Sequence, residues 1–470
     1  MSKNVKYISS THYGAPQITC HWGKTVEVLR KSLSEGFNER TDVTLIEILN
    51  ARHIKITFVT AHNYTENQTV VINGTIFAHL NDEFRVVSND ELSITCEVYT
   101  EFTESQLIVD ITTYEGITVK VAPLGFIEKY RDGDRSAFTT DEEEAFFYMD
   151  DREPTQWPNA FSANYFPLMC PLVFMTDSMN NIDDEGKHVV PYDIYNPTRH
   201  RTKDWLIGTN KKTGLWNWLT YGHHSNSVGT HESSRNSISH WYIIGNGRFF
   251  YFICDTISKG NAQHPRIFYF GKPNNNVKNS DLNYIMNNTN YTYQSNHDYD
   301  DSRIINPASK YALEVSSITS SNMHASNMNY SPYGILKING KPRDININCI
   351  PQNGNNVPSG SLFNNSSLTY PDKNTMKIYV SDFYYTCKEG YMGRLSGAKF
   401  VYNADANIHN HGIIFKYNRN GVHKKYFCIQ GTFPNLQNVA TTSVSVAYDT
   451  AYINKVIFIS LNNEDWYNYD

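Results

Sequence analysis

Apolar and polar residues alternate with a period of two between residues 41 and 125. The strand-like segments are HIKITFV (53–59), QTVVING (68–74), EFRVVSN (83–89), LSITCEVY (92–99), QLIVDITTY (106–114) and ITVKVAPLGF (117–126). Alternation sends successive side chains to opposite faces of a strand, and the short polar segments between these runs serve as turns. We therefore predict a small antiparallel β-sandwich or barrel over residues 41–130.

One helix is predicted ahead of these strands, within an N-terminal arm that covers residues 1–40. Val26, Leu29 and Leu33 recur three and four residues apart, which forms a single apolar stripe on a helix. Gly36 is expected to end the helix, with Phe37 packing back on it. Val26, Leu29, Leu33 and Phe37 are therefore candidates for either a domain core or a contact between subunits.

The alternation stops at an acidic, Pro-containing segment, residues 131–159, which is predicted to be a connector. Within it AFFYM (145–149) is apolar enough to form a strand instead. Residues 160–470 are predicted to form a larger β-rich domain with Asn-rich loop excursions, and a subdivision near 303–370 is one option. Its clearest element is a hairpin in which WYII and RFFYFIC flank Gly-Asn-Gly at 245–247.

The composition supports a folded, mainly β protein and argues against nucleic acid and membrane as its partners. The 470 residues include 33 Tyr and 24 Phe, which suit half-buried pleated surfaces and are rare in disordered chains. A net charge of −6 lacks the basic footprint of a nucleic-acid binder. No run of about 18 apolar residues occurs, so no membrane insertion is expected. Seven scattered cysteines without a C-x-x-C pair are typical of buried thiols in a reducing cytosol.

No catalytic, cofactor-binding or metal-binding residue is predicted, and no cofactor. His223 with His224, and His409 with His411, are the best metal-ligand candidates, but supporting carboxylates or cysteines are missing and local hydrogen bonding is the favoured interpretation. DGDRSAFTTDEE (132–143) begins like a calcium loop, although the Gly and Glu that such a loop needs do not both fall into place. No nucleophile elbow, phosphate-binding loop or dinucleotide fingerprint appears.

Tyr284, Tyr291, Tyr293 and Tyr299 lie in the most Asn-rich segment, residues 272–302. We predict that they form an exposed aromatic contact loop. Exposed tyrosine rings stack on sugars or on another protein. The alternative, which the sequence supports equally, is that each ring packs over neighbouring backbone.

Several short motifs occur in one collinear order. GAPQITCHWGKTVEVLRKSLSEGF combines Gly-Ala-Pro, a spacer ending in Gly, an aliphatic helix and Gly-Phe. It is followed by VVINGTIFAHLNDEFRVVS, ITVKVAPLGFIEKY, SHWYIIGNGRFFYFICDT, IFYFGKPNNNVKNSDLNYIM, YMGRLSGAKFVYN and INKVIFISLNNEDW. Together these segments resemble a family of tailed-bacteriophage virion structural proteins. The chain departs from that family in its Asn-rich insertions and at Asp82, where the family has Gly.

The resemblance implies a protein that is assembled in the host cytoplasm, is located in the virion and has no catalytic residues to transfer. We expect an oligomeric neck or tail protein, at a collar, baseplate or fibre-attachment position, that contacts copies of itself and other phage structural proteins. One alternative is a receptor- or glycan-binding tail module that binds a host surface glycan. A capsule-degrading tail enzyme is a third hypothesis, which no carboxylate pair or repeat supports.

Overall fold

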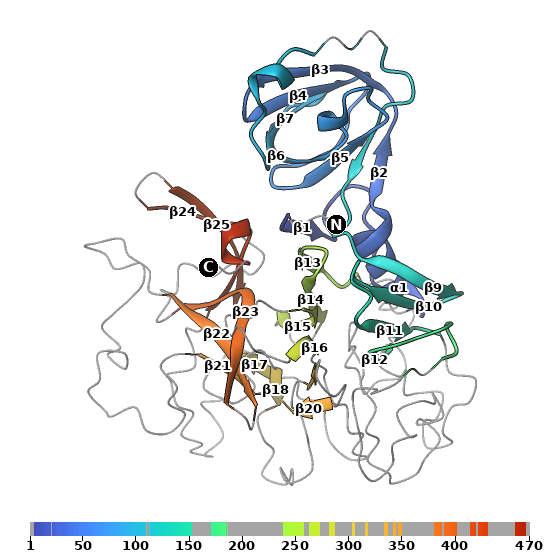
Figure 1. The fold of residues 1–470 in the computed structure, drawn as a ribbon, viewed down its shortest axis with the longest axis vertical. Coiled ribbons are helices and arrows are strands. Elements are labelled where there is room, and N and C mark those ends of the chain that lie inside the picture. The colour runs from blue at the N-terminus through green and yellow to red at the C-terminus, as the bar shows by residue number, and fades with distance from the viewer. Residues whose placement is uncertain are drawn as a thin grey trace, which may run out of the picture.

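The computed structural model of the protein describes residues 4–19, 21–109, 111, 113–152, 171–184, 186, 238–257, 263–272, 282–286, 303–305, 315–317, 333–336, 342–344, 346–349, 380–387, 390–401, 414–419, 422–430 and 456–466. Within them the chain is mainly β, as predicted, with antiparallel sheets and one short α-helix. The N-terminal part contains a rolled sheet that projects from a body of stacked sheets (Figure 1).

The projecting part, residues 37–121, is called the rolled module. It is a seven-stranded sheet, in the order β2-β8-β5-β6-β7-β4-β3, that curls around its own core (Figure 1). Its strands are β2 (Phe37–Arg40), β3 (Val43–Asn50), β4 (His53–Phe58), β5 (Thr69–Asn73), β6 (Glu83–Asn89), β7 (Ser93–Val98) and β8 (Thr118–Val121). Alternate residues of β4, namely Ile54, Ile56 and Phe58, are buried inside it, as the period of two predicts.

One predicted strand of the module is wrong, and two strands were not predicted. The segment 106–114 forms no strand in its described residues; instead a 3₁₀ turn, Glu104–Gln106, is held by a capping box between Thr103 and Gln106. A second 3₁₀ turn, Ala78–Leu80, lies in the loop between β5 and β6. The unpredicted strands are β2, in the segment expected to belong to the N-terminal arm, and β3.

The body is built around a seven-stranded central sheet in the order β1-β13-β14-β15-β16-β19-β20. Its strands are β1 (Lys6–Ser9), β13 (Trp241–Gly245), β14 (Phe249–Ile257), β15 (Gln263–Gly271), β16 (Leu282–Met286), β19 (Tyr333–Leu336) and β20 (Pro342–Asp344). The predicted aromatic hairpin is confirmed as β13–β14, in which Gly245 pairs with Phe250. Asn246 Oδ1 tightens the turn by accepting hydrogen bonds from the backbone N–H groups of Arg248 and Phe249.

A four-stranded sheet in the order β12-β11-β10-β9 packs on one side of the central sheet. Its strands are β9 (Ile127–Asp132), β10 (Arg135–Thr139), β11 (Phe146–Asp150) and β12 (Leu172–Thr176). The connector predicted over 131–159 is therefore wrong for β10 and β11, and the alternative of a strand at 145–149 is confirmed. Phe138 and Phe147 explain this, because both are fully buried in the core shared with the central sheet.

A six-stranded sheet in the order β21-β22-β23-β26-β25-β24 covers the other side. Its strands are β21 (Asn346–Cys349), β22 (Val380–Cys387), β23 (Gly390–Val401), β24 (Ile414–Arg419), β25 (Val422–Gln430) and β26 (Val456–Ser460). A 3₁₀ turn, Asn463–Asp465, brings Trp466 back onto this sheet, and Gly397 is required there because a Cβ would lie 2.3 Å from the indole. A separate pair of strands consists of β17 (Arg303–Ile305) and β18 (Val315–Ser317).

Both faces of the central sheet are therefore buried where the structure describes its side chains. On β14, Phe250 and Phe252 belong to the core shared with the rolled module, α1 and the four-stranded sheet. Their neighbours Tyr251 and Ile253 belong to a second core, shared with the six-stranded sheet. A strand that is covered on both sides needs apolar residues at every position, which accounts for the aromatic run of β14.

The predicted helix is α1 (Lys24–Arg30), which continues as a π-helical turn, Lys31–Glu35. Gly36 ends it with a φ of 77°, as expected of Gly at this position. Val26, Leu29, Leu33 and Phe37 are all buried in the core between the module and the body. The option of a subunit contact at these four residues is therefore wrong, because sheets of the same chain already cover the apolar stripe.

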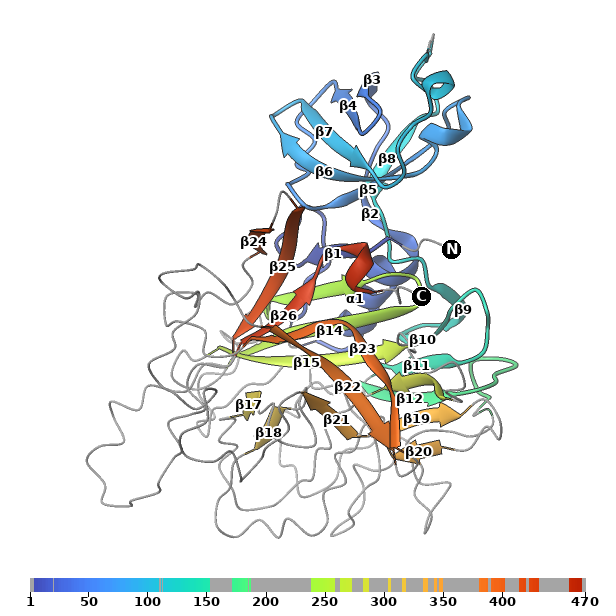
Figure 2. The ribbon, with the colours of Figure 1, turned by 60° about the vertical axis from the view of Figure 1, so that its left-hand side comes forward.

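Polar contacts join the rolled module to the body near the start of β25 (Figure 2). Arg85 of β6 donates hydrogen bonds from Nη2 to the carbonyl oxygens of Val5 (3.1 Å) and Leu461 (2.8 Å). Lys425 of β25 donates from Nζ to Asn67 Oδ1 at 2.8 Å. Both ends of the chain thus help to hold the module in place.

Candidate functional site

The predicted aromatic contact loop is wrong at the one tyrosine that the structure describes. Tyr284 lies in β16 and is fully buried, with its hydroxyl 2.7 Å from Thr140 Oγ1 and its ring stacked on Phe270. It is buried because β16 joins the central sheet, both faces of which are covered. Tyr291, Tyr293 and Tyr299 lie outside the described residues.

The acidic segment is used for internal ion pairs. Glu142 pairs with Arg248 and Lys272, and Lys272 Nζ also lies 3.0 Å from Glu144 Oε2. Asp132, at the start of the calcium-like sequence, pairs with Arg135 in the β9–β10 turn. Strand β10 separates these two groups of carboxylates, so they do not form one loop around an ion. The candidate metal-binding histidines, at 223, 224, 409 and 411, lie outside the described residues.

The cysteines that the structure describes with their side chains are buried and form no disulfide, as predicted. They are Cys96, Cys254 and Cys428. Burial raises the pKa of Cys428 to about 12 and also raises that of Cys96. A thiol that stays protonated at neutral pH is a poor nucleophile, so these two act as small core side chains.

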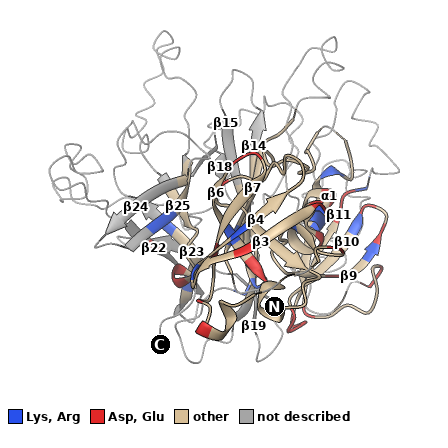
Figure 3. Ribbon diagram, turned by 90° about the horizontal axis from the view of Figure 1, so that it is seen from above, with Lys and Arg blue, Asp and Glu red and all other residues tan. Residues whose placement is uncertain are grey.

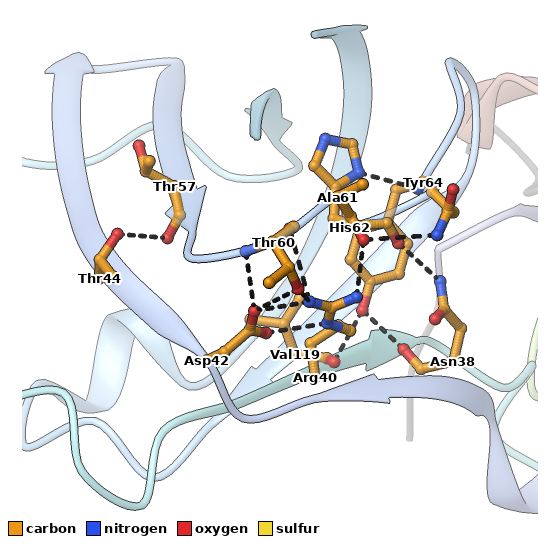
Figure 4. A network of polar contacts seen from close by, with 11 residues as sticks. Asn38, Arg40, Asp42, Thr44, Thr57, Thr60, Ala61, His62, Tyr64 and Val119 are labelled. Carbon is orange, nitrogen blue, oxygen red and sulfur yellow. Dashed lines mark hydrogen bonds and ion pairs between the residues drawn. The ribbon is translucent and has the colours of Figure 1, made fainter. Parts of the chain in front are cut away.

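The residues that set the course of β3 lie at the corner where β2 turns into it (Figure 4). Arg40 donates from Nε to Asp42 Oδ1 at 2.8 Å, from Nη2 to Oδ2 at 2.6 Å, and from Nη1 to the carbonyl oxygen of Ala61 at 2.8 Å. Asp42 also accepts hydrogen bonds from the backbone N–H and the hydroxyl of Thr60. The bonds from Arg40 and Thr60 lower the pKa of Asp42 to about 2, so the corner stays ionised and closed at neutral pH.

A second anchor at this corner is Tyr64 (Figure 4). Its buried hydroxyl lies 2.7 Å from the carbonyl oxygen of Asn38 and 2.8 Å from that of Val119, so it ties β2 to β8. His62 Nδ1 accepts from the backbone N–H of Tyr64 at 2.8 Å, and Nε2 donates to the carbonyl oxygen of Ser93 at 3.2 Å. Burial lowers the pKa of His62, which favours this neutral tautomer.

From this corner β3 runs along the open edge of the module. It pairs with β4 on one side, and the described part of the chain places no strand on its other side. Ile46 points into the core and is buried, whereas Leu45 and Leu49 are 38% and 50% exposed. Glu47 is exposed between them and is the only charged residue of the strand. The edge therefore presents apolar side chains together with unpaired backbone groups, which is a template for pairing with another strand.

The edge of β9, in the four-stranded sheet, has a different composition. Lys129, Arg131 and Asp132 are exposed along it, and only Ile127 adds an exposed apolar side chain. Charged side chains on an edge strand discourage pairing with other chains. Seen from above, both signs of charge lie along β9 and its turn, whereas β3 is tan except at its acidic residue (Figure 3). Of these two edges, charged side chains line β9, whereas β3 carries exposed apolar side chains and no described strand covers it.

Neither a family model nor a curated protein matches this chain. The residues that the structure describes hold no group of three or more His, Cys, Asp or Glu side chains that is arranged to bind a metal ion. Among those same residues, no helix is both long and apolar enough to cross a membrane.

Further exposed apolar side chains lie elsewhere on the rolled module. Ile76, between β5 and β6, is 79% exposed, and Ile108, between β7 and β8, is 82% exposed. The complete set of exposed large apolar residues on the module is Leu45, Leu49, Val59, Ile76, Leu92, Leu107 and Ile108. Scattered apolar residues are ordinary on a protein surface, but a strand edge lined with them indicates a contact.

Sequence reasoning missed β3 because two bulges interrupt its alternation. The pairing with β4 shifts between Val43 and Leu45 and again between Ile48 and Asn50. Each bulge adds a residue and breaks the period of two, so VTLIEILN does not read as a half-buried strand. The signal that was available is its content of β-branched and aliphatic residues over eight positions.

Proposed function

We propose that the protein is a structural subunit of a tailed-phage virion, at the neck or tail, which assembles through protein–protein contacts made by the rolled module. The observation that carries the assembly role is the open edge of β3 with exposed Leu45 and Leu49. The virion setting rests on the collinear resemblance of the sequence motifs. The interior positions of Val26, Leu29 and Leu33 move the proposed contact from the helix to the module.

The mechanism is addition of a strand to β3 from a neighbouring subunit. Backbone hydrogen bonds supply affinity, and the outward-facing Leu45 and Leu49 supply apolar contacts. A single strand pairing is a small contact and dissociates readily. Repeated around a ring, such contacts reinforce each other, because each bound neighbour raises the effective concentration of the next.

The test is to recover the protein from purified virions of the encoding phage and to ask whether β3 is needed there. A Leu45→Lys, Leu49→Lys double variant is expected to enter particles at a much lower level than the wild type. Two positive charges on an edge strand disfavour its pairing with a strand of another chain. Ile127→Lys, at the exposed β9 edge, is the matched control and should be incorporated normally. Mass spectrometry that finds no wild-type protein in the particles would overturn the proposed function.

A further inference from the structure

The exposed part of β3 is a sequence palindrome: Leu45-Ile46-Glu47-Ile48-Leu49 reads the same in both directions. We propose that β3 pairs with β3 of a second copy of this chain, antiparallel and centred on Glu47. This inference rests on the proposed function and names the partner of the open edge. An interface around a two-fold axis requires residue i to meet residue j while j meets i. Any antiparallel pair of identical strands meets that condition, and the palindrome adds that each pair of facing positions carries the same kind of side chain.

The faces of the strand agree with this register. Centred on Glu47, Ile46 lies opposite Ile48 of the second copy on the inner face, and Leu45 lies opposite Leu49 on the outer face. Within one copy, Ile46 and Ile48 face Ile56 and Ile54 of β4. Ile46 is buried and Ile48 only partly so. An added strand therefore covers the side chain that the open edge leaves half-covered.

The edge is also accessible to a second copy. β3 lies at the end of the rolled module that is furthest from the body in both side views (Figures 1 and 2). The bulges at Thr44 and Leu49 confine regular pairing with β4 to Leu45–Ile48. Four of the five palindrome residues, Leu45–Ile48, thus lie in the regular part of the edge, whereas Leu49 lies at a bulge, where the strand bends.

The centre of the proposed contact carries a like-charge pair. Glu47 would lie opposite Glu47 of the second copy, and Lys55, its cross-strand neighbour on β4, flanks it in each copy. Like charges directly opposite each other weaken strand pairing, and the two lysines offset part of that effect. The contact is therefore weak in the free protein and becomes stable when several copies are held together. A partner strand of unrelated sequence would not have to place a glutamate opposite Glu47 and so would not meet this repulsion.

The register makes a specific prediction for disulfide trapping in the full-length protein. Residues directly opposite in an antiparallel pair have Cα atoms about 4.5 or 5.5 Å apart, which a disulfide can span. Glu47→Cys is therefore expected to form a covalent dimer under mild oxidation. Leu45→Cys alone is not, because its two copies lie about 14 Å apart, four residues along the strand. A mixture of Leu45→Cys and Leu49→Cys proteins should cross-link to each other.

Wild-type protein under the same oxidation is the control for the native thiols, and the Lys24→Cys variant is a control for an exposed thiol elsewhere. A second measurement avoids any new cysteine: Glu47→Gln should tighten self-association several-fold in sedimentation experiments, and Glu47→Lys should not. Cross-linking of Leu45→Cys to itself would instead indicate parallel pairing and would overturn the inference.

Failure of this inference is distinct from failure of the proposed function. If Glu47→Cys forms no dimer, and the wild-type protein is still found in virions, the second copy is the wrong partner and the assembly role stands. Cross-linking of Glu47→Cys to a different virion protein has the same meaning. If the protein is absent from virions but Glu47→Cys dimerises, the pairing stands and the virion role is lost.

Discussion

Lys6 of β1 and Glu83 of β6 form a buried ion pair between the body and the rolled module, with 2.5 Å between Nζ and Oε1. The Lys6 side chain is fully buried and also donates to the carbonyl oxygen of Pro123. Burial lowers the pKa of Lys6, and the neighbouring Glu83 carboxylate partly offsets that effect. The orientation of the module thus depends on an ion pair whose lysine is fully buried and whose carboxylate is largely buried.

Lys6→Met should destabilise the protein, because it leaves the Glu83 carboxylate largely buried without its main cation. Removing one partner of a buried pair costs about 3–5 kcal/mol in free energy of unfolding. The thermal unfolding midpoint is the measurement. Lys24→Met removes an exposed pair with Glu27 and should cost less than about 1 kcal/mol. Equal shifts of the unfolding midpoint in the two variants would show that the pair of Lys6 and Glu83 stabilises the protein no more than an exposed ion pair does.

Asp151→Ala should loosen the start of α1. Asp151 Oδ2 accepts hydrogen bonds from the backbone N–H groups of Thr25 (2.8 Å) and Val26 (3.1 Å), which the helix itself leaves unpaired. Loss of such a cap costs about 1–2 kcal/mol. Hydrogen exchange at residues 24–30 is expected to accelerate, with Asp141→Ala, at an exposed position in the β10–β11 turn, as the control. If hydrogen exchange at residues 24–30 is unchanged in both variants, Asp151 does not cap the helix.

Stability should fall as the pH drops from about 6.5 towards 3, through His12. Burial lowers the pKa of His12 to about 3, and its Nδ1 accepts a hydrogen bond from the backbone N–H of Ser9. Because the unfolded chain takes up a proton near pH 6.5, stability present above that pH is lost between the two values, by about 1.4 kcal/mol per pH unit. The His12→Gln variant should show a correspondingly shallower dependence of its unfolding midpoint on pH. His21→Gln, at an exposed position, should keep the wild-type dependence.

Tyr64→Phe should weaken the corner from which β3 begins. It removes the hydroxyl that lies between the carbonyl oxygens of Asn38 and Val119, at a cost of about 1–3 kcal/mol. Tyr13→Phe, at a tyrosine that is 60% exposed, should have little effect on the unfolding midpoint. If self-association through β3 needs a rigid corner, sedimentation of Tyr64→Phe will also show a weaker dimer. A thermal unfolding midpoint equal to that of the wild type would show that Arg40 and Asp42 stabilise the corner without the Tyr64 hydroxyl.

The local sequence pattern was sufficient to predict an element where the interactions that form it join residues close together in the sequence. The Gly-Asn-Gly hairpin was predicted because its turn and its aromatic pairs lie within one segment. The end of α1 at Gly36 was predictable for the same reason, since a positive φ favours Gly. The acidic connector failed because the burial of Phe138 and Phe147 depends on contact with the distant central sheet.

For the residues that the structure describes, the sequence by itself determined the mainly β class, the short helix, the burial of Cys96, Cys254 and Cys428, and the apolar stripe of Val26, Leu29 and Leu33. It did so because periodicity reports which side chains share a face. Only the tertiary structure decided what covers each face: it buried that stripe and Tyr284 within the chain and, among the strands that the structure describes, left β3 at the edge of its sheet. The reason is physical, since an edge exists only once the order of strands is set by long-range pairing.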